Sequence, residues 1–152
     1  MGQLIKTEKE LSELREKLKG QTIVATNGCF DILHVGHVRY LKEAKSQGNI
    51  LVIGVNSDSS VKSLKGSTRP INNEQDRAEI LNALSFVDYT YIFSEIEASK
   101  FLLTLKPDIY DKGGDYDLEK LPEKEAIKSI GARIHFSTFH NGHSTSSTLM
   151  KM

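Results

Sequence analysis

Short apolar runs alternate with amphipathic segments along most of the chain. The apolar runs predict strands at Thr22–Thr26, Ile50–Val55, Tyr89–Phe93, Asp108–Asp111 and Arg133–Thr138. Between them, apolar side chains recur every three to four residues, which is typical of helices that bury one face. These helices are expected at Val38–Gln47, Ser59–Leu64, Glu74–Leu84, Glu97–Leu105 and Glu123–Ile130, with a final turn from Ser144.

The first twenty residues predict one more helix. Thr7 is followed three residues later by Glu10, which is the pattern of a capping box. Leu11, Leu14 and Leu18 then share one helix face, and Gly20 can end the helix. We therefore expect an N-terminal amphipathic helix over residues 1–20, followed by the core of the same single domain over residues 21–152.

The alternation of strands and helices defines the expected fold class. Unalternating apolar runs such as Ile50–Ile53 suit strands that are buried on both faces. Strands that alternate with helices at this spacing form crossovers between parallel strands. The sequence thus predicts an α/β fold, a Rossmann-like doubly wound parallel sheet of about five strands. In such sheets ligands bind beyond the carboxyl ends of the strands.

Composition narrows the choice of partners and location. The 152 residues carry 20 Lys and Arg against 20 Asp and Glu, so no positive surplus favours nucleic acid. The single cysteine cannot form an internal disulfide, which fits a reducing compartment. A charged N-terminus without an apolar stretch gives no signal peptide, and no apolar run is long enough to cross a membrane. We expect a cytoplasmic protein.

The segment after the first predicted strand carries the most informative chemistry. It contains Gly28, Phe30 and Asp31, and then the sequence His-Val-Gly-His at residues 34–37. Neither G-x-G-x-x-G nor G-x-x-x-x-G-K-[ST] is present, which argues against both common nucleotide fingerprints. His34 and His37, three apart at a helix start, can face one bound phosphate, and Gly36 allows it to approach the backbone. Surface or packing roles are the alternative; a zinc site would need further ligands nearby.

This segment resembles the signature G-x-F-D-x-x-H-x-G-H of the cytidylyltransferase-like nucleotidyltransferase superfamily. The resemblance implies a Rossmann-like fold that joins a nucleoside triphosphate to a phosphorylated acceptor and releases pyrophosphate. It implies catalytic roles for His34 and His37 and a lysine, Lys42, near the triphosphate. It also implies that Arg77 helps to hold the substrates. The remaining motif positions expected to bind nucleotide are Asn27, Gly28, Cys29, Phe30, Asp31 and Gly36.

A basic segment follows the second predicted strand. Lys62, Lys65 and Arg69 concentrate positive charge beyond the carboxyl end of that strand, where an anionic substrate would lie. We assign Lys65 to catalysis, and we assign Asn56, Asp58, Lys62 and Arg69 to substrate binding. A solvated helix face is the alternative for the lysines. Cys29 is interpreted as a packing residue rather than a nucleophile.

Two later loops complete the expected nucleotide site. Lys112, Gly113, Gly114 and Asp115 follow the fourth predicted strand, and their glycines permit a base or ribose to approach, or simply form a turn. After the last strand, a helix start rich in hydroxyls suits an anion. Its expected nucleotide-binding residues are Gly142, Ser144, Thr145 and Ser146. His135 is expected to be structural, whereas the roles of His140 and His143 stay open.

Five segments together are similar to one branch of the superfamily, the adenylyltransferases that act on D-glycero-β-D-manno-heptose 1-phosphate. They are T-N-G-C-F-D-I-L-H-V-G-H, L-K-G-S-T-R-P-I-N, N-A-L-S-F-V-D, D-K-G-G-D-Y and N-G-H-S-T-S. The resemblance implies ATP and a sugar 1-phosphate as substrates, Mg²⁺ held mainly by the triphosphate without a direct protein ligand, and a possible homodimer. Ser146 and His143 depart from the usual residues of the branch. Asp31 could orient a histidine or approach the metal.

Two other functions are compatible with these residues. One is a cytidylyltransferase that makes a CDP-alcohol such as CDP-glycerol. The other is a non-catalytic nucleotide-binding module, although such a module does not need both histidines.

Overall fold

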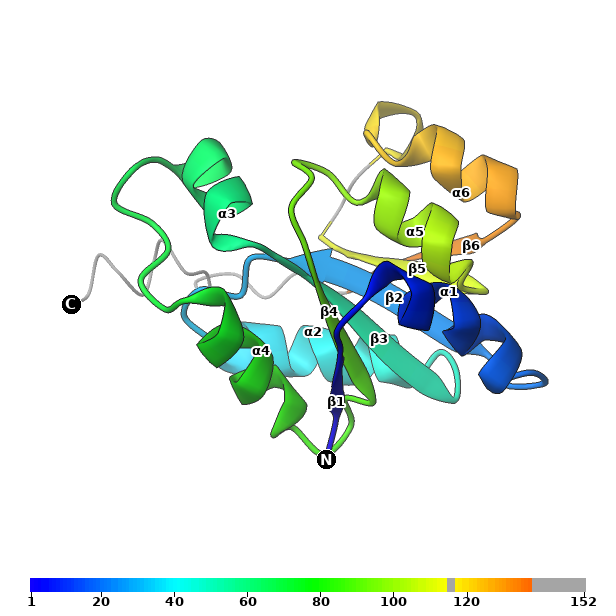
Figure 1. The fold of residues 1–152 in the computed structure, drawn as a ribbon. Helices are drawn as coiled ribbons and strands as arrows, with labels where there is room; N and C mark the ends of the chain where they lie inside the picture. Colours follow the sequence, from blue (N-terminus) through cyan, green and yellow to red (C-terminus); the bar gives the residue numbers. More distant parts are fainter. Residues whose placement is uncertain (115–116, 138–152) are drawn as a thin grey trace.

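The computed structural model describes residues 1–114 and 117–137, which form an α/β domain with a six-stranded sheet (Figure 1). The strands are β1 (Gln3–Ile5), β2 (Ile23–Gly28), β3 (Ile50–Asn56), β4 (Tyr89–Phe93), β5 (Ile109–Gly113) and β6 (Arg133–Ser137). The helices are α1 (Glu8–Lys17), α2 (Val35–Lys45), α3 (Asp58–Lys65), α4 (Glu74–Asn82), α5 (Ser99–Leu105) and α6 (Lys124–Ile130), with a short 3₁₀ helix η1 (Leu118–Lys120).

The strand order reverses at one point within the sheet, and folds of this kind bind ligands in the crevice outside the carboxyl ends of the strands at that point. The strands lie in the order β1-β4-β3-β2-β5-β6, and every pair is parallel. From β2 the chain moves outward through β3 to β4, and then returns to place β5 on the other side of β2. The order therefore reverses between β2 and β5. The segments that follow β2 and β5 therefore diverge, and they leave space for a ligand between them in folds of this kind. The predicted doubly wound fold is confirmed.

Helices cover both faces of the sheet (Figure 1). Leu11, Leu14 and Phe101 belong to the core under α1, α5 and α6. Leu41 and Leu81 belong to the second core, under α2 and α4. Helix α3 covers neither face and lies beyond the carboxyl end of β3. The alternation of side chains along β2, which sends Ile23 and Ala25 to one core and Val24 to the other, is why its sequence reads as a continuous apolar run.

The sheet has six strands where the sequence predicts about five. The additional strand is β1, within the segment expected to be wholly helical, and it pairs with β4 at the edge of the sheet. The helix itself is present, and Thr7 caps it by accepting a hydrogen bond from the N–H of Glu10 at 3.1 Å. This helix begins at Glu8 and ends at Lys17 rather than spanning residues 1–20, and α2 begins at Val35 rather than Val38.

No helix in the described ranges is both long enough and apolar enough to span a bilayer.

Candidate active site

The two histidines of the His-Val-Gly-His sequence lie together at the start of α2, just beyond the carboxyl end of β2. His34 is the N-cap residue and His37 lies in the first turn. The two rings stack, with their centroids 3.9 Å apart and their planes 26° from parallel. The Gly36 N–H donates to Nδ1 of His34 at 3.1 Å, and the His34 N–H donates to Nδ1 of His37 at 3.2 Å. The motif therefore forms its own capping box, in which imidazoles replace the usual hydroxyl and carboxylate.

These two bonds determine which ring nitrogens can act on a ligand. A nitrogen that accepts a hydrogen bond carries no proton, so a neutral ring in this arrangement holds its proton on Nε2. Burial, together with the nearby charges of His34 and Lys65, lowers the pKa of His37 to about 4. His37 is therefore neutral at physiological pH, and its Nε2–H is a hydrogen-bond donor without a full positive charge.

Phe30 supports this pair from the loop before α2. Its ring packs edge-on against His37, with centroids 5.3 Å apart, and only 7% of the residue is exposed. Phe30 has a φ of 48°, a left-handed conformation that is uncommon for a bulky residue. A Cβ atom on Gly28 would lie 3.0 Å from this ring, so the glycine leaves the space that Phe30 occupies. Both residues were predicted to bind nucleotide; the contacts observed are with each other and with His37.

Asp31 faces the loop between α3 and α4. Its buried carboxylate accepts hydrogen bonds from the Nε of Arg69 at 2.6 Å and from the N–H groups of Ile71 and Asn72 at 2.8–2.9 Å. The Asn72 side chain also donates to the Asp31 carbonyl at 2.8 Å. These hydrogen bonds and the Arg69 guanidinium lower the pKa of Asp31 against the opposing effect of burial. Asp31 thus anchors this loop, and no hydrogen bond joins it to either histidine within the described residues.

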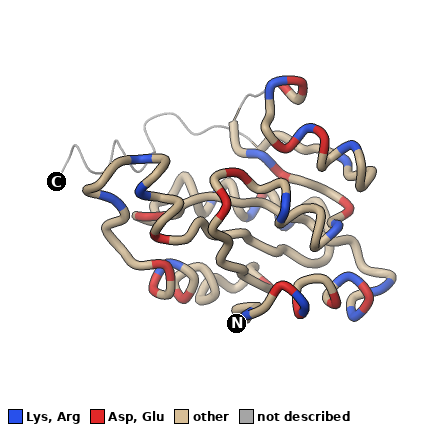
Figure 2. Tube along the Cα trace, turned by 45° about the horizontal axis from the view of Figure 1, so that its top comes forward, with Lys and Arg blue, Asp and Glu red and all other residues tan. Residues whose placement is uncertain are grey.

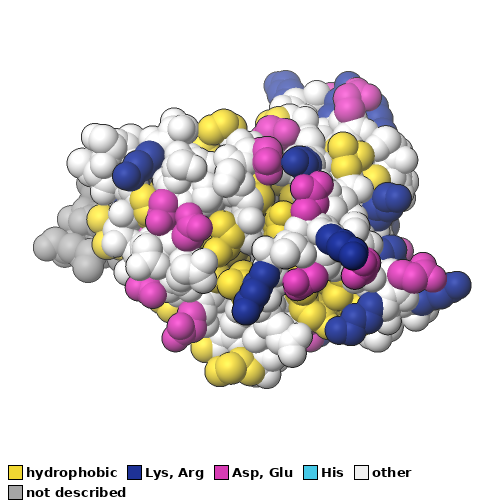
Figure 3. Space-filling view, in the orientation of Figure 1, with side chains coloured by type: hydrophobic (Ala, Val, Ile, Leu, Met, Phe, Trp, Pro, Cys, Tyr) yellow, Lys and Arg dark blue, Asp and Glu magenta, His cyan; other side chains and the backbone are white. Residues whose placement is uncertain are grey.

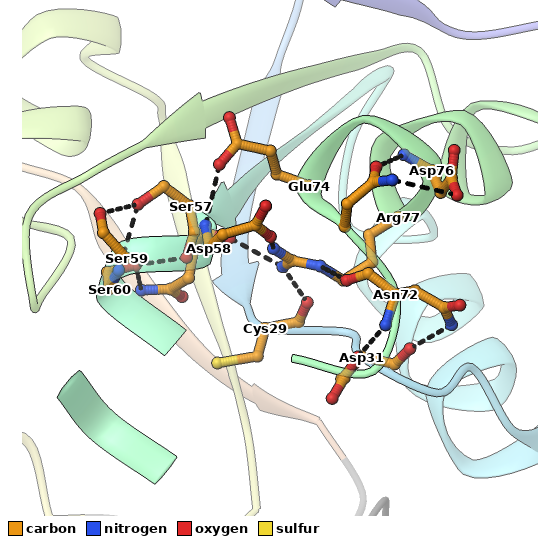
Figure 4. Close-up of polar contacts among 12 residues, drawn as sticks. Cys29, Asp31, Ser57, Asp58, Ser59, Ser60, Asn72, Glu74, Asp76 and Arg77 are labelled. Atoms are coloured by element: carbon orange, nitrogen blue, oxygen red, sulfur yellow. Dashed lines mark hydrogen bonds and ion pairs between the residues drawn. The ribbon is translucent and has the colours of Figure 1, made fainter. Parts of the chain in front are cut away.

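Arg77 holds together three segments beside the histidines (Figure 4). Its guanidinium is completely buried. Nη1 donates to the carbonyls of Cys29 at 2.8 Å and Asn56 at 2.7 Å, at the ends of β2 and β3. Nε donates to the carbonyl of Asn72 at 2.9 Å, and Nη2 pairs with the Asp58 carboxylate at 2.8 Å. Arg77 therefore fixes the walls of the crevice, and four of its five N–H groups serve this purpose.

Asn56 and Asp58, which were predicted to bind substrate, belong to the hydrogen-bond network around Arg77. The Asn56 side chain donates to the hydroxyl of Ser60 at 3.2 Å, while the Asp58 carboxylate is occupied by Arg77. The Asp58 N–H donates to Glu74 at 2.8 Å. In Figure 4 the Cys29 carbonyl faces the guanidinium and the thiol points away from it. Burial raises the pKa of this thiol, although the charges of Lys65, Arg77 and Arg69 oppose the shift.

The basic segment borders the histidines. Lys62 and Lys65 lie on α3, and Arg69 lies in the loop after it. Figure 2 shows this segment at its left, with several basic positions in blue. Lys62 and Lys65 are exposed. The ammonium of Lys65 is close enough to lower the pKa values of both His37 and Cys29, which connects it to the site. Arg69 is mostly buried, and its Nη2 is a buried nitrogen without a hydrogen-bond partner in the described structure.

Lys42 has a different position from the other predicted cations. It is exposed on α2, five residues after His37. At 3.6 residues per turn, this places it about 140° around the helix from His37 and about 7.5 Å along the axis. Of the two lysines assigned to catalysis, Lys65 is the one whose charge acts on His37.

The turn after β5 forms the opposite side of the crevice from β3. A Cβ atom on Gly113 would lie 2.8 Å from the Tyr40 ring, so this glycine allows α2 to pack closely on β5. Gly114 has a φ of 97°, a backbone conformation that favours glycine. Lys112 is half-buried in the same strand. On β2, the Asn27 carboxamide accepts a hydrogen bond from the buried Tyr110 hydroxyl at 2.5 Å.

The predicted positions Asp115, Gly142, Ser144, Thr145 and Ser146, together with His140 and His143, lie outside the described residues.

Several residues that shape the site were not predicted. Tyr40 packs under Gly113 and its hydroxyl contacts that of Thr26. Ser57 caps α3 and Asn73 caps α4, by accepting hydrogen bonds from the N–H groups of Ser60 and Asp76. Ser57 and Asn73 precede acidic first turns, which is a recognisable sequence signal. Nothing local in the sequence identifies Tyr40.

Within residues 1–114 and 117–137, no group of three or more His, Cys, Asp or Glu side chains could hold a metal ion.

Comparison with known proteins identifies the family. Residues 25–151 match the family model described as cytidylyltransferase-like. The chain belongs to the cytidylyltransferase-like family. The histidines at the carboxyl end of β2 thus belong to a nucleotidyltransferase, and the resemblance inferred from the sequence is confirmed.

Relatives within this family are similar over nearly all of the chain. The "Bifunctional protein HldE" of Geobacter metallireducens is 50% identical over 137 residues, which cover 90% of this chain and 28% of that protein. The protein of the same name from Aliarcobacter butzleri is 47% identical and matches 97% of this chain and 31% of its own length. The chain therefore spans less than a third of the length of these curated relatives.

Two solved structures are similar to the chain. The lipopolysaccharide core biosynthesis protein of Thermoplasma volcanium is 33% identical, with a TM-score of 0.64 over 80% of this chain and 98% of that one. The pantoate-beta-alanine ligase of Francisella tularensis is 18% identical, with a TM-score of 0.68 over 100% of this chain and 74% of that one. The second likeness concerns the fold alone.

Proposed function

We propose that this chain transfers AMP from ATP to a sugar 1-phosphate, D-glycero-β-D-manno-heptose 1-phosphate, giving the ADP-sugar and pyrophosphate. The stacked pair of His34 and His37 at the N-terminus of α2 carries the proposal. A helix N-terminus at the carboxyl edge of a parallel sheet is a site for phosphate, and two Nε2–H donors can be directed at one group there. The similarity to the HldE proteins over 90–97% of the chain supports the choice of acceptor.

The proposed reaction is a direct displacement at the α-phosphorus. An oxygen of the acceptor phosphate attacks that atom, the bond from it to the bridging oxygen breaks, and pyrophosphate leaves with the bonding electrons. A phosphate monoester is already an anionic nucleophile, so the reaction needs no protein nucleophile and no strong base. Catalysis then consists of positioning the two substrates and stabilising charge on the transferred group.

The described side chains supply that stabilisation in two ways. Neutral His37, and His34 stacked on it, would donate hydrogen bonds through Nε2 to phosphate oxygens. Lys65 would supply a full positive charge from α3. Arg77 and Asp31 would act on the loops around the substrates, because their hydrogen bonds are made to other groups of the protein. Mg²⁺, held by the triphosphate, would neutralise further charge.

A cytidylyltransferase is the second candidate, because the matching family model is described as cytidylyltransferase-like. A homodimer and a cytoplasmic location stay predictions from the sequence.

The proposal is tested by measuring pyrophosphate release from the purified chain with a matrix of substrates. ATP, CTP, GTP and UTP are each combined with heptose 1-phosphates of both anomers, glycerol 3-phosphate and a hexose 1-phosphate, with Mg²⁺ present. We expect the highest kcat/KM for ATP with D-glycero-β-D-manno-heptose 1-phosphate. A higher value for CTP with glycerol 3-phosphate would replace this function by the second candidate, and no release with any pair would refute both.

A further inference from the structure

A polar cluster fastens α2 to the strands β5 and β6, beside the apolar core. We define the acidic–histidine cluster as Glu43 of α2, Asp111 of β5 and His135 of β6. Nε2 of His135 lies 2.8 Å from the Glu43 carboxylate and 3.9 Å from Oδ2 of Asp111. Ser137 of β6 donates to Oδ1 of Asp111 at 2.6 Å. One imidazole thus lies between two carboxyl groups from different elements.

The carboxyl group of Asp111 is buried with only one of its two oxygens hydrogen-bonded in the described structure. The residue is completely buried, and its Oδ2 has no hydrogen-bond partner among the residues that the structure describes. Burial raises its pKa to about 6, and the negative charge of Glu43 acts in the same direction, while Ser137 and His135 oppose the shift. A buried acid with one open oxygen is costly to keep ionised, so it carries a proton more readily than an exposed aspartate.

The cluster joins the two halves of the active site. Helix α2 begins with His34 and His37, whereas β5 continues from Asp111 directly into Lys112, Gly113 and Gly114. The Tyr40 hydroxyl of α2 donates to the Asp111 carbonyl at 3.5 Å. The Ser137 carbonyl accepts a hydrogen bond from the Gly114 N–H at 3.1 Å. A change in how α2 sits on β5 and β6 therefore shifts the histidine pair relative to the turn at residues 112–114.

We propose that Asp111 is a positioning residue for nucleotide binding, whose charge controls how closely α2 packs on β5 and β6. The titratable groups that act on its carboxyl group are Glu43 from α2 and His135 from β6, whereas the Tyr40 hydroxyl of α2 contacts its backbone carbonyl. Ionised Asp111 buries a negative charge on a carboxyl group whose Oδ2 has no hydrogen-bond partner in the described structure, and Glu43 adds a like charge across the helix–sheet interface. Both effects weaken the packing, whereas protonation of Asp111 removes them. The inference rests on the proposed function, because it assigns a role within the same nucleotide site.

The test compares nucleotide binding by the wild type and by Asp111→Asn at pH 5.5 and pH 7.5. Titration calorimetry with a non-hydrolysable ATP analogue and Mg²⁺ gives Kd for each protein. Taking the ratio of the wild-type Kd to the variant Kd cancels the protonation of the nucleotide itself. We expect this ratio to rise at least threefold from pH 5.5 to pH 7.5, because only the wild type acquires the buried charge. Glu43→Gln should reproduce part of the change.

Glu119→Gln serves as the matched control, since Glu119 is an exposed carboxylate that pairs with Lys124 and Lys128. Its Kd ratio to wild type should not depend on pH. A wild-type/Asp111→Asn ratio that stays constant would overturn the inference and leave the proposed function intact. If Asp111→Asn fails to fold, the same pH series on Glu43→Gln decides, and a constant ratio there overturns the inference. A wild type that binds no nucleotide at either pH would overturn both.

Discussion

The two histidines make hydrogen bonds that fix both their orientation and their tautomer. Each Nδ1 accepts a backbone N–H, so each neutral ring has its donor on Nε2. Spacing in the sequence predicts that they face one group, and the structure brings the rings into contact. The capping role of His34 could not be predicted, because histidine is not among the preferred N-cap residues.

The low pKa of His37 predicts how stability depends on pH. The folded value of about 4 lies below the value of about 6.5 for an unfolded chain, so the unfolded state binds more protons between these limits. The stability contributed by neutral His37 is complete above pH 6.5 and is lost as the pH falls toward 4. Urea unfolding at pH 7.0 and pH 4.5 should therefore show a larger loss for the wild type than for His37→Asn. Equal losses would contradict the lowered pKa.

Lys65 is the exposed cation that we expect to act on the phosphates. Lys65→Ala should reduce kcat/KM by roughly 10–100-fold, the loss of a charged contact worth about 1.5–3 kcal/mol, with an unchanged melting temperature. Lys17→Ala is the matched control, because Lys17 is an exposed lysine at the end of α1 without a predicted role. Lys42→Ala is measured as well, because Lys42 is the other lysine assigned to catalysis. Similar kinetics for Lys65→Ala and the wild type would make Lys65 a solvated surface residue, and a larger effect of Lys42→Ala would reverse the assignment.

At the scale of elements, the loops that leave β2 and β3 are joined to the loop before α4 through Arg77 and Asp31. Arg77 binds two carbonyls at strand ends and one in the loop, and Asp31 binds the N–H groups of Ile71 and Asn72. Neither role is visible in the sequence, because each depends on contacts across 40–48 positions or on backbone atoms that every residue possesses. The charges of Arg77 and Asp31 predict that each binds a group of opposite charge, but in the structure these groups are side chains of the protein, Asp58 and Arg69.

The network predicts that Arg77 contributes mainly to stability. Arg77→Met should lower the free energy of unfolding by about 3–5 kcal/mol, because it leaves buried carbonyls without donors. Arg77→Lys keeps the charge but cannot reproduce the fork of donors, so it should lose part of the same stability. Urea denaturation gives both values. A folded Arg77→Lys with wild-type stability and a greatly raised KM for ATP would instead show that Arg77 binds the nucleotide.

Most helices and strands could be predicted because each buries a long apolar pattern. β1 was missed because it has only three residues and is stabilised by pairing with β4 rather than by its own pattern. The start of α2 was placed three residues late because Gly36 and the histidines are unusual in a first turn. In both cases long-range pairing or local capping outweighed residue preference.

At the scale of the whole molecule, the strand order and the charge distribution decide where substrates can bind. The reversal of strand order between β2 and β5 places the histidines beside the turn at residues 112–114. The alternation of strands and helices in the sequence predicts only that the site lies at the carboxyl edge of the sheet. On the face shown in Figure 3, acidic, basic and apolar side chains are interspersed without a continuous basic surface. The local positive charge on α3 therefore stands out against a neutral molecule, as a site for small anions requires.

The central claim is that His34 and His37 stabilise charge during nucleotidyl transfer, and one measurement tests it most directly. It compares kcat for pyrophosphate release with the melting temperature in the wild type, His34→Asn and His37→Asn. Asparagine can accept the same backbone hydrogen bonds through its Oδ1, so these variants keep the start of α2 while removing Nε2. We predict that kcat falls by about 10²–10³ in each variant, with a nearly unchanged melting temperature. Near-normal kcat together with a large drop in melting temperature in both variants would make the histidines structural and contradict the account.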